Sequence, residues 1–327
     1  MPAKHMYSKR TLGRTNIAVT PIGLGMMEFA GGAGLMGSAF PVIAQKEKNA
    51  IVQAALEGGI NWFDTAELYG AGVSEASLCA ALKAAGKADH EVVVATKWWP
   101  MFRTARNIPR TIQDRIRFLG GYTIGLYMVH HPSSFSSVEA EMEAMADLVE
   151  AGKIRSVGVS NFNSGKMRRA YRALQKRGLP LAANQVRYSL LDRSIERNGI
   201  LDTAQELGIT ITAYTPLASG LLTGKYHRDP ELLRKKSWYW RARLERGVGK
   251  SRKLVTALDE IGIKYDATAG QVALNWLIHS HGETVVAIPG VTKVRQAEES
   301  AGAMSFKLSD SDMDRLSELS LRLQQGA

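Results

Sequence analysis

The sequence lacks the features that define several classes of protein. Its 327 residues include one cysteine, Cys79, which excludes an intramolecular disulfide framework and a cysteine-rich metal site and makes a reducing cytoplasm the expected location. No apolar run approaches the roughly 20 residues of a membrane-spanning helix. The first ten residues hold basic side chains without a following apolar segment, so no signal peptide is expected.

Acidic residues are the scarcer charge, with 31 Asp and Glu against 42 Lys and Arg and a formal net charge of +11. Hydrophobic residues make up 45% and charged residues 22% of the chain. This composition is typical of globular proteins and excludes intrinsic disorder, collagen-like repeats and a heptad coiled coil. The positive charge alone is compatible with nucleic acid, an anionic ligand or no charged partner.

Short apolar segments alternate with longer amphipathic ones along most of the chain. The short segments are rich in Val and Ile and carry few charges, as strands buried on both faces do. We predict strands at Ile22–Gly25, Trp62–Asp64, Val92–Lys97, Ile124–His130, Ile154–Ser160, Asn184–Val186, Ile209–Tyr214 and Val285–Pro289. We predict helices at Lys46–Glu57, Ser74–Ala85, Pro109–Leu119, Val138–Ala151, Ser164–Arg177, Gly199–Leu207, Leu254–Ile261, Thr268–His279, Val294–Ala303 and Ser309–Leu323.

Eight strand–helix units without a Ser- or Pro-rich linker favour one (β/α)₈ barrel over a doubly wound sheet. The expected fold is therefore a single domain over residues 1–327. Tyr7–Leu12 and Ile17–Thr20 flank a turn and predict a hairpin before the first barrel strand.

A long insert interrupts this pattern after the seventh strand. It is longer by roughly 40 residues than an ordinary strand–helix connection, so we expect a long loop there. Residues Lys225–Lys253 hold eleven Lys and Arg against three acidic residues, a local net charge of +8, and include the aromatic run Trp238-Tyr239-Trp240. Three interpretations stay open: a solvated face, a lid over an anionic cofactor or substrate, and a nucleic-acid surface.

Ionisable side chains end three neighbouring predicted strands. Asp64, Lys97 and His130 follow strands two, three and four, and Tyr69 comes five residues after Asp64. The carboxyl ends of barrel strands converge on one face, where active sites lie. We therefore expect these four side chains to meet there.

Together these groups can protonate a carbonyl oxygen. A phenol with a pKa near 10 is a poor acid at neutral pH, and a neighbouring ammonium, oriented by a carboxylate, is expected to lower that pKa. Tyr69 could then give its proton as hydride reaches the carbonyl carbon, and His130 could donate a second hydrogen bond to the same oxygen.

At these residues the chain resembles the aldo-keto reductases. The resemblance runs in order from about residue 10 to 304 and rests on several stretches together. They are GINWFDTAELYG (59–70), GVSEASLCAALKA (72–84), VVVATKW (92–98), LYMVHHP (126–132), LVEAGKIRSVGVSNFN (148–163), NQVRYSLLDR (184–193), AYTPLASGLLTGKY (213–226) and IPGVTKVRQAEES (288–300).

The resemblance implies that Asp64, Tyr69, Lys97 and His130 form the catalytic tetrad of that family, with Tyr69 as the general acid. The His-x-Pro spacing selects His130 over His131. It further implies NADP(H) as cofactor, a carbonyl substrate and no metal. Tyr69, His130 and the rim residue Trp98 are the expected substrate contacts.

The implied cofactor contacts follow the matching motifs along the chain. Ser160, Asn161 and Gln185 match residues that bind the nicotinamide carboxamide, and Tyr214 matches the aromatic residue that stacks on its ring. The remaining implied contacts are Gly25, Met26 and Asp64 near the catalytic end, Thr215, Pro216, Leu217, Ser219, Gly220 and Lys225 at the pyrophosphate, and Gly290, Thr292, Lys293, Gln296, Glu299 and Ser300 at the adenosine end.

One departure from the family concerns the first strand. The family commonly has Thr after GLG, whereas Gly25 here is followed by Met26 and Met27, which puts the ribose contacts at this point in doubt. The segment Gly32–Gly37 spells GxGxxG, but Pro41 follows where a Rossmann helix would have to open, so we expect a loop at the barrel mouth instead.

Two rival functions remain at this point. One is a non-catalytic NADP(H)-binding sensor or regulatory subunit on the same fold, and the other is a nucleic-acid binder that uses the basic insert. The sequence names neither the carbonyl substrate nor the oligomeric state.

Overall fold

The computed structural model describes residues 7–38, 40–235 and 238–325. Ala39, Lys236 and Ser237 of the two expected mouth loops lie outside the described residues, as do the side chains of Tyr239 and Trp240.

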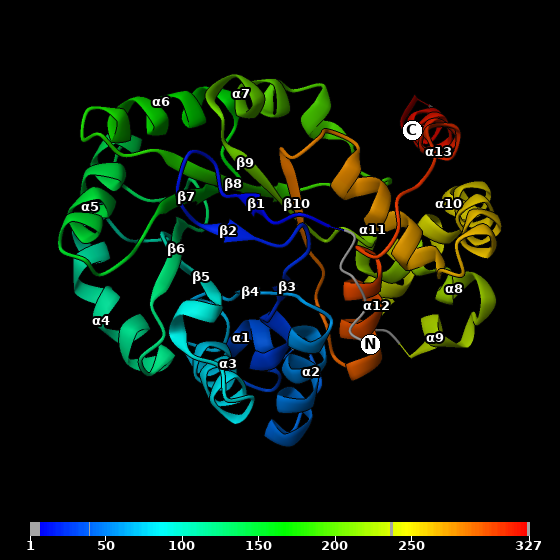
Figure 1. The fold of residues 1–327 in the computed structure, drawn as a ribbon, viewed down its shortest axis with the longest axis horizontal. Coiled ribbons are helices and arrows are strands. Elements are labelled where there is room, and N and C mark those ends of the chain that lie inside the picture. Colours follow the sequence, from blue (N-terminus) through cyan, green and yellow to red (C-terminus); the bar gives the residue numbers. More distant parts are fainter. Residues whose placement is uncertain (1–6, 39, 236–237, 326–327) are drawn as a thin grey trace.

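Eight parallel strands form the centre of the molecule (Figure 1). The strands are β3 (Leu24–Gly25), β4 (Trp62–Asp64), β5 (Val93–Trp98), β6 (Ile124–Val129), β7 (Val157–Ser160), β8 (Leu181–Arg187), β9 (Thr210–Tyr214) and β10 (Val285–Ile288). They pair in sequence order from β3 to β10. Parallel bridges between Ile22 and Ala287 and between Gly25 and Gly290 join the first strand to the last and close the barrel. We call this junction the seam.

Helices surround the barrel on the outside. They are α2 (Gln45–Glu57), α3 (Val73–Ala84), α4 (Ile108–Leu119), α5 (Val138–Glu150), α6 (Ser164–Gln175), α7 (Ile200–Leu207), α11 (Ala269–His279), α12 (Val294–Gly302) and α13 (Asp310–Gln325). Short helices lie in the connections: η1 (Met27–Ala30), α1 (Gly34–Gly37), η2 (Asp89–Glu91), η3 (Ala105–Asn107), η4 (Ser194–Glu196) and η5 (Ala218–Thr223). The predicted barrel is thus confirmed, with element ends shifted by a few residues.

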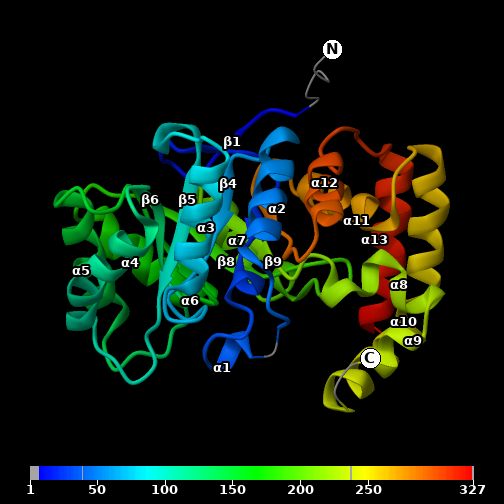
Figure 2. The ribbon, with the colours of Figure 1, turned by 90° about the horizontal axis from the view of Figure 1, so that it is seen from below.

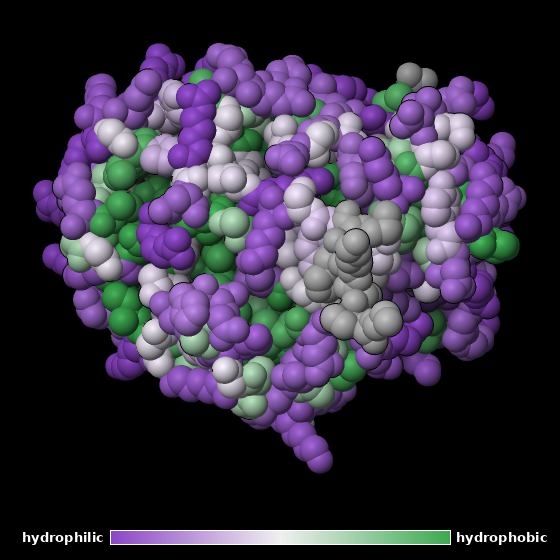
Figure 3. Space-filling model, in the orientation of Figure 1, coloured by the Kyte–Doolittle hydropathy of each residue, from purple (hydrophilic) through white to green (hydrophobic). Residues whose placement is uncertain are grey.

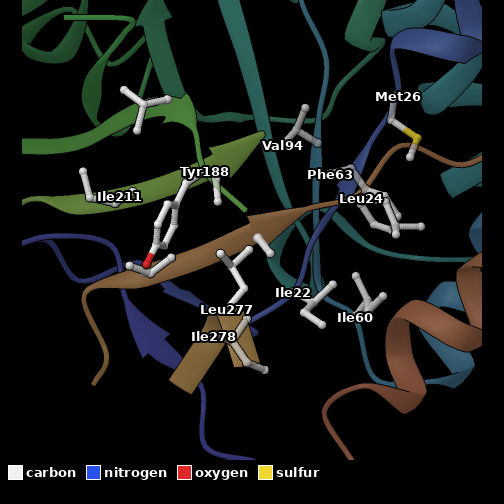
Figure 4. Packing of buried hydrophobic residues seen from close by; sticks show 14 of the residues in the cluster. Ile22, Leu24, Met26, Ile60, Phe63, Val94, Tyr188, Ile211, Leu277 and Ile278 are labelled. Atoms are coloured by element: carbon white, nitrogen blue, oxygen red, sulfur yellow. The ribbon is translucent and has the colours of Figure 1, made fainter. Parts of the chain in front are cut away.

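Strand side chains alternate between two cores, because successive residues of a strand point to opposite faces. Outward-facing residues such as Phe63 and Val94 pack against the helices in the larger core, part of which Figure 4 shows. Inward-facing residues such as Trp62, Val93 and Met128 fill the barrel itself. The inward row continues to the carboxyl ends of the strands and decides which side chains reach the mouth.

The predicted hairpin, β1 (Arg10–Thr11) and β2 (Ala18–Val19), closes the amino-terminal end of the barrel. It crosses the front of the molecule in Figure 1. Leu12, Ile17 and Val19 belong to the same apolar cluster as the barrel interior. In Figure 3 this face is mostly hydrophilic, with apolar side chains showing between the polar ones. The carboxyl ends of the strands, which we call the mouth, lie at the opposite end, which faces down in Figure 2.

The insert after β9 is helical, which corrects the expectation of a long loop. It contains α8 (Lys225–Arg228), α9 (Glu231–Arg234) and α10 (Trp238–Lys264), and α10 also replaces the shorter helix predicted at Leu254–Ile261. Arg, Lys, Leu, Ala and Glu are strong helix formers. Leu244 and Val248, four residues apart, pack with Leu221 of η5, and Gly247 lets the Leu221 side chain approach α10 closely.

The basic insert is therefore packed beside the connection that follows β9 (Figure 2). Over the described part of the chain, no helix is both long and apolar enough to cross a membrane.

Candidate active site

Inward-facing polar residues end successive strands at the mouth. Asp64 closes β4, Lys97 lies next to the end of β5, and His130 directly follows β6. Asp64 and Lys97 are buried. Because each of the three continues the inward row of its strand, their side chains meet as the sequence predicted.

Asp64 and Lys97 form an ion pair at the floor of the mouth. The Lys97 Nζ lies 2.5 Å from Asp64 Oδ2 and also donates to the carbonyl of Thr65 at 2.8 Å. The other carboxylate oxygen accepts from Gln185 Nε2 at 2.9 Å. Burial raises the pKa of Asp64 and lowers that of Lys97, and the charge of each partner opposes the effect on the other. The two groups depend on each other to stay charged.

Tyr69 stands over this pair. It lies in the turn after β4, is 9% exposed, and has its ring centroid 5.0 Å from Lys97 Nζ. Burial raises the pKa of Tyr69 well above 10, and the Asp64 and Glu28 carboxylates raise it further. The expected lowering of the Tyr69 pKa is thus wrong, because burial and the nearby carboxylates raise it. Tyr69 is therefore a protonated phenol at neutral pH.

His130 completes the cluster. Its ring lies edge-on to Tyr69, with the centroids 5.7 Å apart, and edge-on to Trp99 at 5.4 Å. Burial, together with the charge of Lys97, lowers the pKa of His130 well below 6.5. Its Nδ1 is buried and has no hydrogen-bond partner among the described residues. His130 is therefore a neutral imidazole with hydrogen-bonding capacity left over.

A chain of hydrogen bonds continues around the mouth from His130 to Tyr214. Asn161 donates to the His130 carbonyl at 3.3 Å and to Ser160 Oγ at 3.0 Å, and it accepts from the Tyr214 hydroxyl at 3.0 Å. Ser160 Oγ donates to the carbonyl of Gln185 at 3.0 Å. The structure thus brings together the four residues that the sequence associated with the nicotinamide.

The connection after β9 has an unusual backbone. Positive φ angles occur at Thr215 (54°), Ala218 (49°), Ser219 (56°) and Gly220 (89°). A Cβ at Gly220 would lie 2.6 Å from Lys225 Nζ, so glycine is required for the ammonium to come this close. Backbones that mix right- and left-handed residues turn successive N–H groups toward one point and bind anions. This segment, which also contains Pro216 and Leu217, mixes the two backbone conformations in this way. Within it, the Ala218 N–H donates to the Thr215 carbonyl at 3.0 Å and the Gly220 N–H to the Leu217 carbonyl at 2.9 Å.

The residues predicted at the adenosine end lie in and around the first turns of α12. Gln296 Oε1 accepts hydrogen bonds from the backbone N–H of Thr292 and of Lys293, at 2.6 and 3.1 Å. Lys293 is exposed at this helix start. Glu299 pairs with Arg295 at 2.9 Å, and Ser300 is buried. Lys293 is thus the exposed residue of this set. The side chains of Thr292, Glu299 and Ser300 have partners on α12 itself.

Trp98 is placed differently from what the sequence suggested. It is fully buried in the outer core, and its Nε1 donates to Asn107 Oδ1 at 2.9 Å. Lys97 points inward, so Trp98 must point outward by strand alternation. Trp99 lies against His130 instead. Met26 is likewise fully buried in the outer core (Figure 4). Its backbone N–H donates to the Asp64 carbonyl at 2.8 Å, and its carbonyl accepts from Ser74 Oγ at 2.6 Å.

Three further residues at the mouth were not identified from the sequence. Glu67 accepts from the backbone N–H of Trp99 at 3.0 Å and from Arg103 at 2.7 Å, which ties together the connections after β4 and β5. Glu28 places its carboxylate against Gly290. Strand alternation could have found Trp99, whereas no sequence signal joins Glu28 to Gly290.

The GxGxxG segment forms no dinucleotide fold. Gly34–Gly37 is a single four-residue helix, and the chain then reaches Pro41 without a longer helix. The described residues also contain no group of three or more His, Cys, Asp or Glu side chains arranged to hold a metal ion.

Comparison with known proteins agrees with this barrel. The sequence model of the Aldo/keto reductase family matches residues 21–321. Aldo-keto reductase str7 of Strobilurus tenacellus is 33% identical over 90% of this chain and 87% of its own length. Aldo-keto reductase yakc [NADP(+)] of Schizosaccharomyces pombe is 30% identical over 88% and 87%.

A solved structure shows the same likeness. The aldo-keto reductase from Klebsiella pneumoniae in complex with NADPH superposes with a TM-score of 0.73 and 26% identity, covering 96% of this chain and 95% of that one. The chain therefore belongs to the aldo/keto reductase family of oxidoreductases.

Proposed function

We propose that this protein reduces an aldehyde or ketone to an alcohol with NADPH, with Tyr69 as the general acid. The observation that carries the proposal is the cluster of Tyr69, His130 and the buried Lys97–Asp64 pair at the carboxyl ends of the barrel strands. When bound, the cofactor supplies the hydride. The chain's own residues supply the proton and hold the carbonyl.

Tyr69 is suited to give a proton only when charge develops on the substrate. Its raised pKa keeps the phenol protonated in the resting protein. An oxygen that becomes an alkoxide is a far stronger base than a phenolate, so proton transfer then runs downhill. Lys97, 5.0 Å from the ring centroid, stabilises the phenolate that results, and Asp64 holds the ammonium in place.

His130 is suited to orient the carbonyl. A neutral imidazole carries one N–H and can donate one hydrogen bond to the substrate oxygen. The field of Lys97 opposes a second proton on the ring. Trp99, edge-on to His130, is the aromatic residue that we propose as a pocket wall in place of Trp98.

The left-handed residues within Thr215–Gly220 and the positive charge of Lys225 beside them support the proposal that a dinucleotide phosphate group binds here. At the start of α12, the exposed Lys293 and the half-buried Thr292 beside it fit a 2′-phosphate, because helix amino termini favour anions. Two similar proteins point the same way. The name of the Schizosaccharomyces pombe relative includes NADP(+), and the Klebsiella pneumoniae structure contains NADPH.

The test is the variant Tyr69→Phe. We expect NADPH to bind with unchanged affinity, measured by quenching of protein fluorescence, while kcat on a panel of aldehydes and ketones falls by about 100-fold or more, the usual effect of losing a general acid. Tyr122→Phe is the matched control, because its hydroxyl bonds the Lys87 carbonyl away from the mouth. Near-wild-type turnover in Tyr69→Phe would refute the mechanism. Wild-type protein that binds NADPH but turns over no carbonyl would favour the sensor instead.

A further inference from the structure

Glu28 lies at the mouth, directly over the seam of the barrel. It belongs to η1, which follows β3. A Cβ added to Gly290 would lie 2.5 Å from Glu28 Oε1 and 2.9 Å from Oε2, so the carboxylate occupies the space above the Gly290 α-carbon. Gly290 in turn pairs with Gly25 across the seam. The carboxylate thus stands between residues that the sequence associated with the cofactor.

The described residues use only part of the hydrogen-bonding capacity of this carboxylate. Its Oε2 is buried and accepts no hydrogen bond from any described residue. Burial raises the pKa of Glu28 to about 7, although a hydrogen bond from its own backbone N–H lowers this pKa. The ammonium of Lys48, on the neighbouring helix α2, donates instead to the Phe29 carbonyl at 2.6 Å and to Ser77 Oγ at 2.8 Å. An unsatisfied buried acceptor points to a donor that a ligand brings.

The position of Glu28 selects which part of the cofactor it can meet. Its charge acts on Tyr69, and η1 packs against that residue through Ala30 and Met27. On the other side lies Gly290, from which α12 and its exposed Lys293 follow. Between a nicotinamide at Tyr69 and phosphates beyond the seam lies the ribose joined to the nicotinamide. Its two neighbouring hydroxyls are donors that a carboxylate can accept, whereas phosphates would be repelled.

The first strand offers no hydroxyl side chain for this task. Met26 is buried in the outer core, and Met27 carries a thioether. We propose that Glu28 accepts hydrogen bonds from the hydroxyls of the nicotinamide-side ribose, and so replaces the threonine that the family commonly has after GLG. This inference rests on the proposed NADPH-dependent function and adds a binding residue to it.

Two ligands distinguish binding of the nicotinamide-side ribose by Glu28 from a general effect of Glu28 on the whole cofactor site. NADPH contains the ribose in question, whereas adenosine 2′,5′-bisphosphate carries only the adenosine end. For Glu28→Ala we expect the Kd for NADPH to rise by about 10- to 100-fold, as for loss of charge-assisted hydrogen bonds, with the Kd for the bisphosphate unchanged. Glu28→Gln keeps an acceptor oxygen, so its Kd for NADPH should rise less than that of Glu28→Ala. Glu298→Ala, an exposed acid on α12, is the control and should change neither value.

The outcomes are distinct. An equal loss of affinity for both ligands would overturn the proposal, because Glu28 would then affect the whole cofactor site. Unchanged or tighter NADPH binding in Glu28→Ala would overturn it as well, because the carboxylate would then be idle or repulsive. Folded wild-type protein that fails to bind NADPH would refute the proposed cofactor itself, before any variant is compared. A loss of affinity for NADPH with unchanged affinity for the bisphosphate supports the proposal.

Discussion

The buried Lys97–Asp64 pair gives a stability prediction with a defined pH dependence. In Asp64→Asn the ammonium of Lys97 stays fully buried but loses the carboxylate that lies 2.5 Å away. Burial already lowers the pKa of Lys97, and the Asp64 charge opposes that shift. Removing one partner of a buried pair costs about 3–5 kcal/mol, because the other charge is left uncompensated.

The loss in Asp64→Asn has an upper limit, because Lys97 can give up its proton. From an unfolded-state lysine pKa near 10.4, deprotonation costs about 5 kcal/mol at pH 7 and about 2 kcal/mol at pH 9. The folded variant then binds one proton fewer than the unfolded chain, so its stability rises with pH by about 1.4 kcal/mol per unit over this range. The destabilisation relative to wild type should therefore shrink between pH 7 and pH 9.

Urea unfolding followed by tryptophan fluorescence at both pH values measures this difference, and groups common to both proteins cancel. The control is the double variant Asp64→Asn with Lys97→Met. It also removes the buried ammonium, so its free energy of unfolding at pH 7 should be several kcal/mol higher than that of Asp64→Asn alone. An equal destabilisation at both pH values, or no recovery in the double variant, would refute the reasoning.

Two further predictions concern stability away from the mouth. Glu141 is buried, accepts from Ser134 Oγ at 2.6 Å, and has its pKa raised by burial to about 7, so the folded state loses stability as pH rises through 4.5–7. Glu141→Gln should gain about 2 kcal/mol over wild type between pH 5 and pH 8 in thermal or urea unfolding, and a constant difference would contradict this. Gly72 has φ +106°, and a Cβ there would lie 2.3 Å from the Phe118 ring, whereas a Cβ at Gly178 meets nothing within 4 Å. Gly72→Ala should therefore cost at least about 1 kcal/mol more than Gly178→Ala, and equal losses in urea unfolding would show that Phe118 moves freely.

The barrel could be predicted because its strands are buried on both faces. Such strands appear as short apolar runs, and β4 at Trp62–Asp64 has the bounds that the sequence indicated. The meeting of Asp64 with Lys97 followed from the convergence of strand ends alone. These features depend on local pattern and on a rule that holds for every barrel.

Other features depend on contacts that no local pattern contains. The part of α10 before the predicted helix at Leu254–Ile261 was missed for two reasons. Its packing partner, Leu221, lies in a different element, and its basic residues with Gly247 and Gly249 resemble a loop. The direction of the Tyr69 pKa shift was wrong because it depends on the depth of burial, which spacing does not give. Trp98 was assigned by its proximity to Lys97, although alternation along the strand sends it outward.

The seam also sets an order of events during synthesis of the chain. The first barrel strand, β3, can close the barrel only with the segment around Ala287 and Gly290, near the other end of the sequence. Until the ribosome has released that segment, the nascent barrel is an open sheet with two free edges. Free edges are templates for pairing with other chains, and closure over so long a separation is slow. The yield of native protein should therefore depend on how well the β3 edge is shielded in the interval before translation ends.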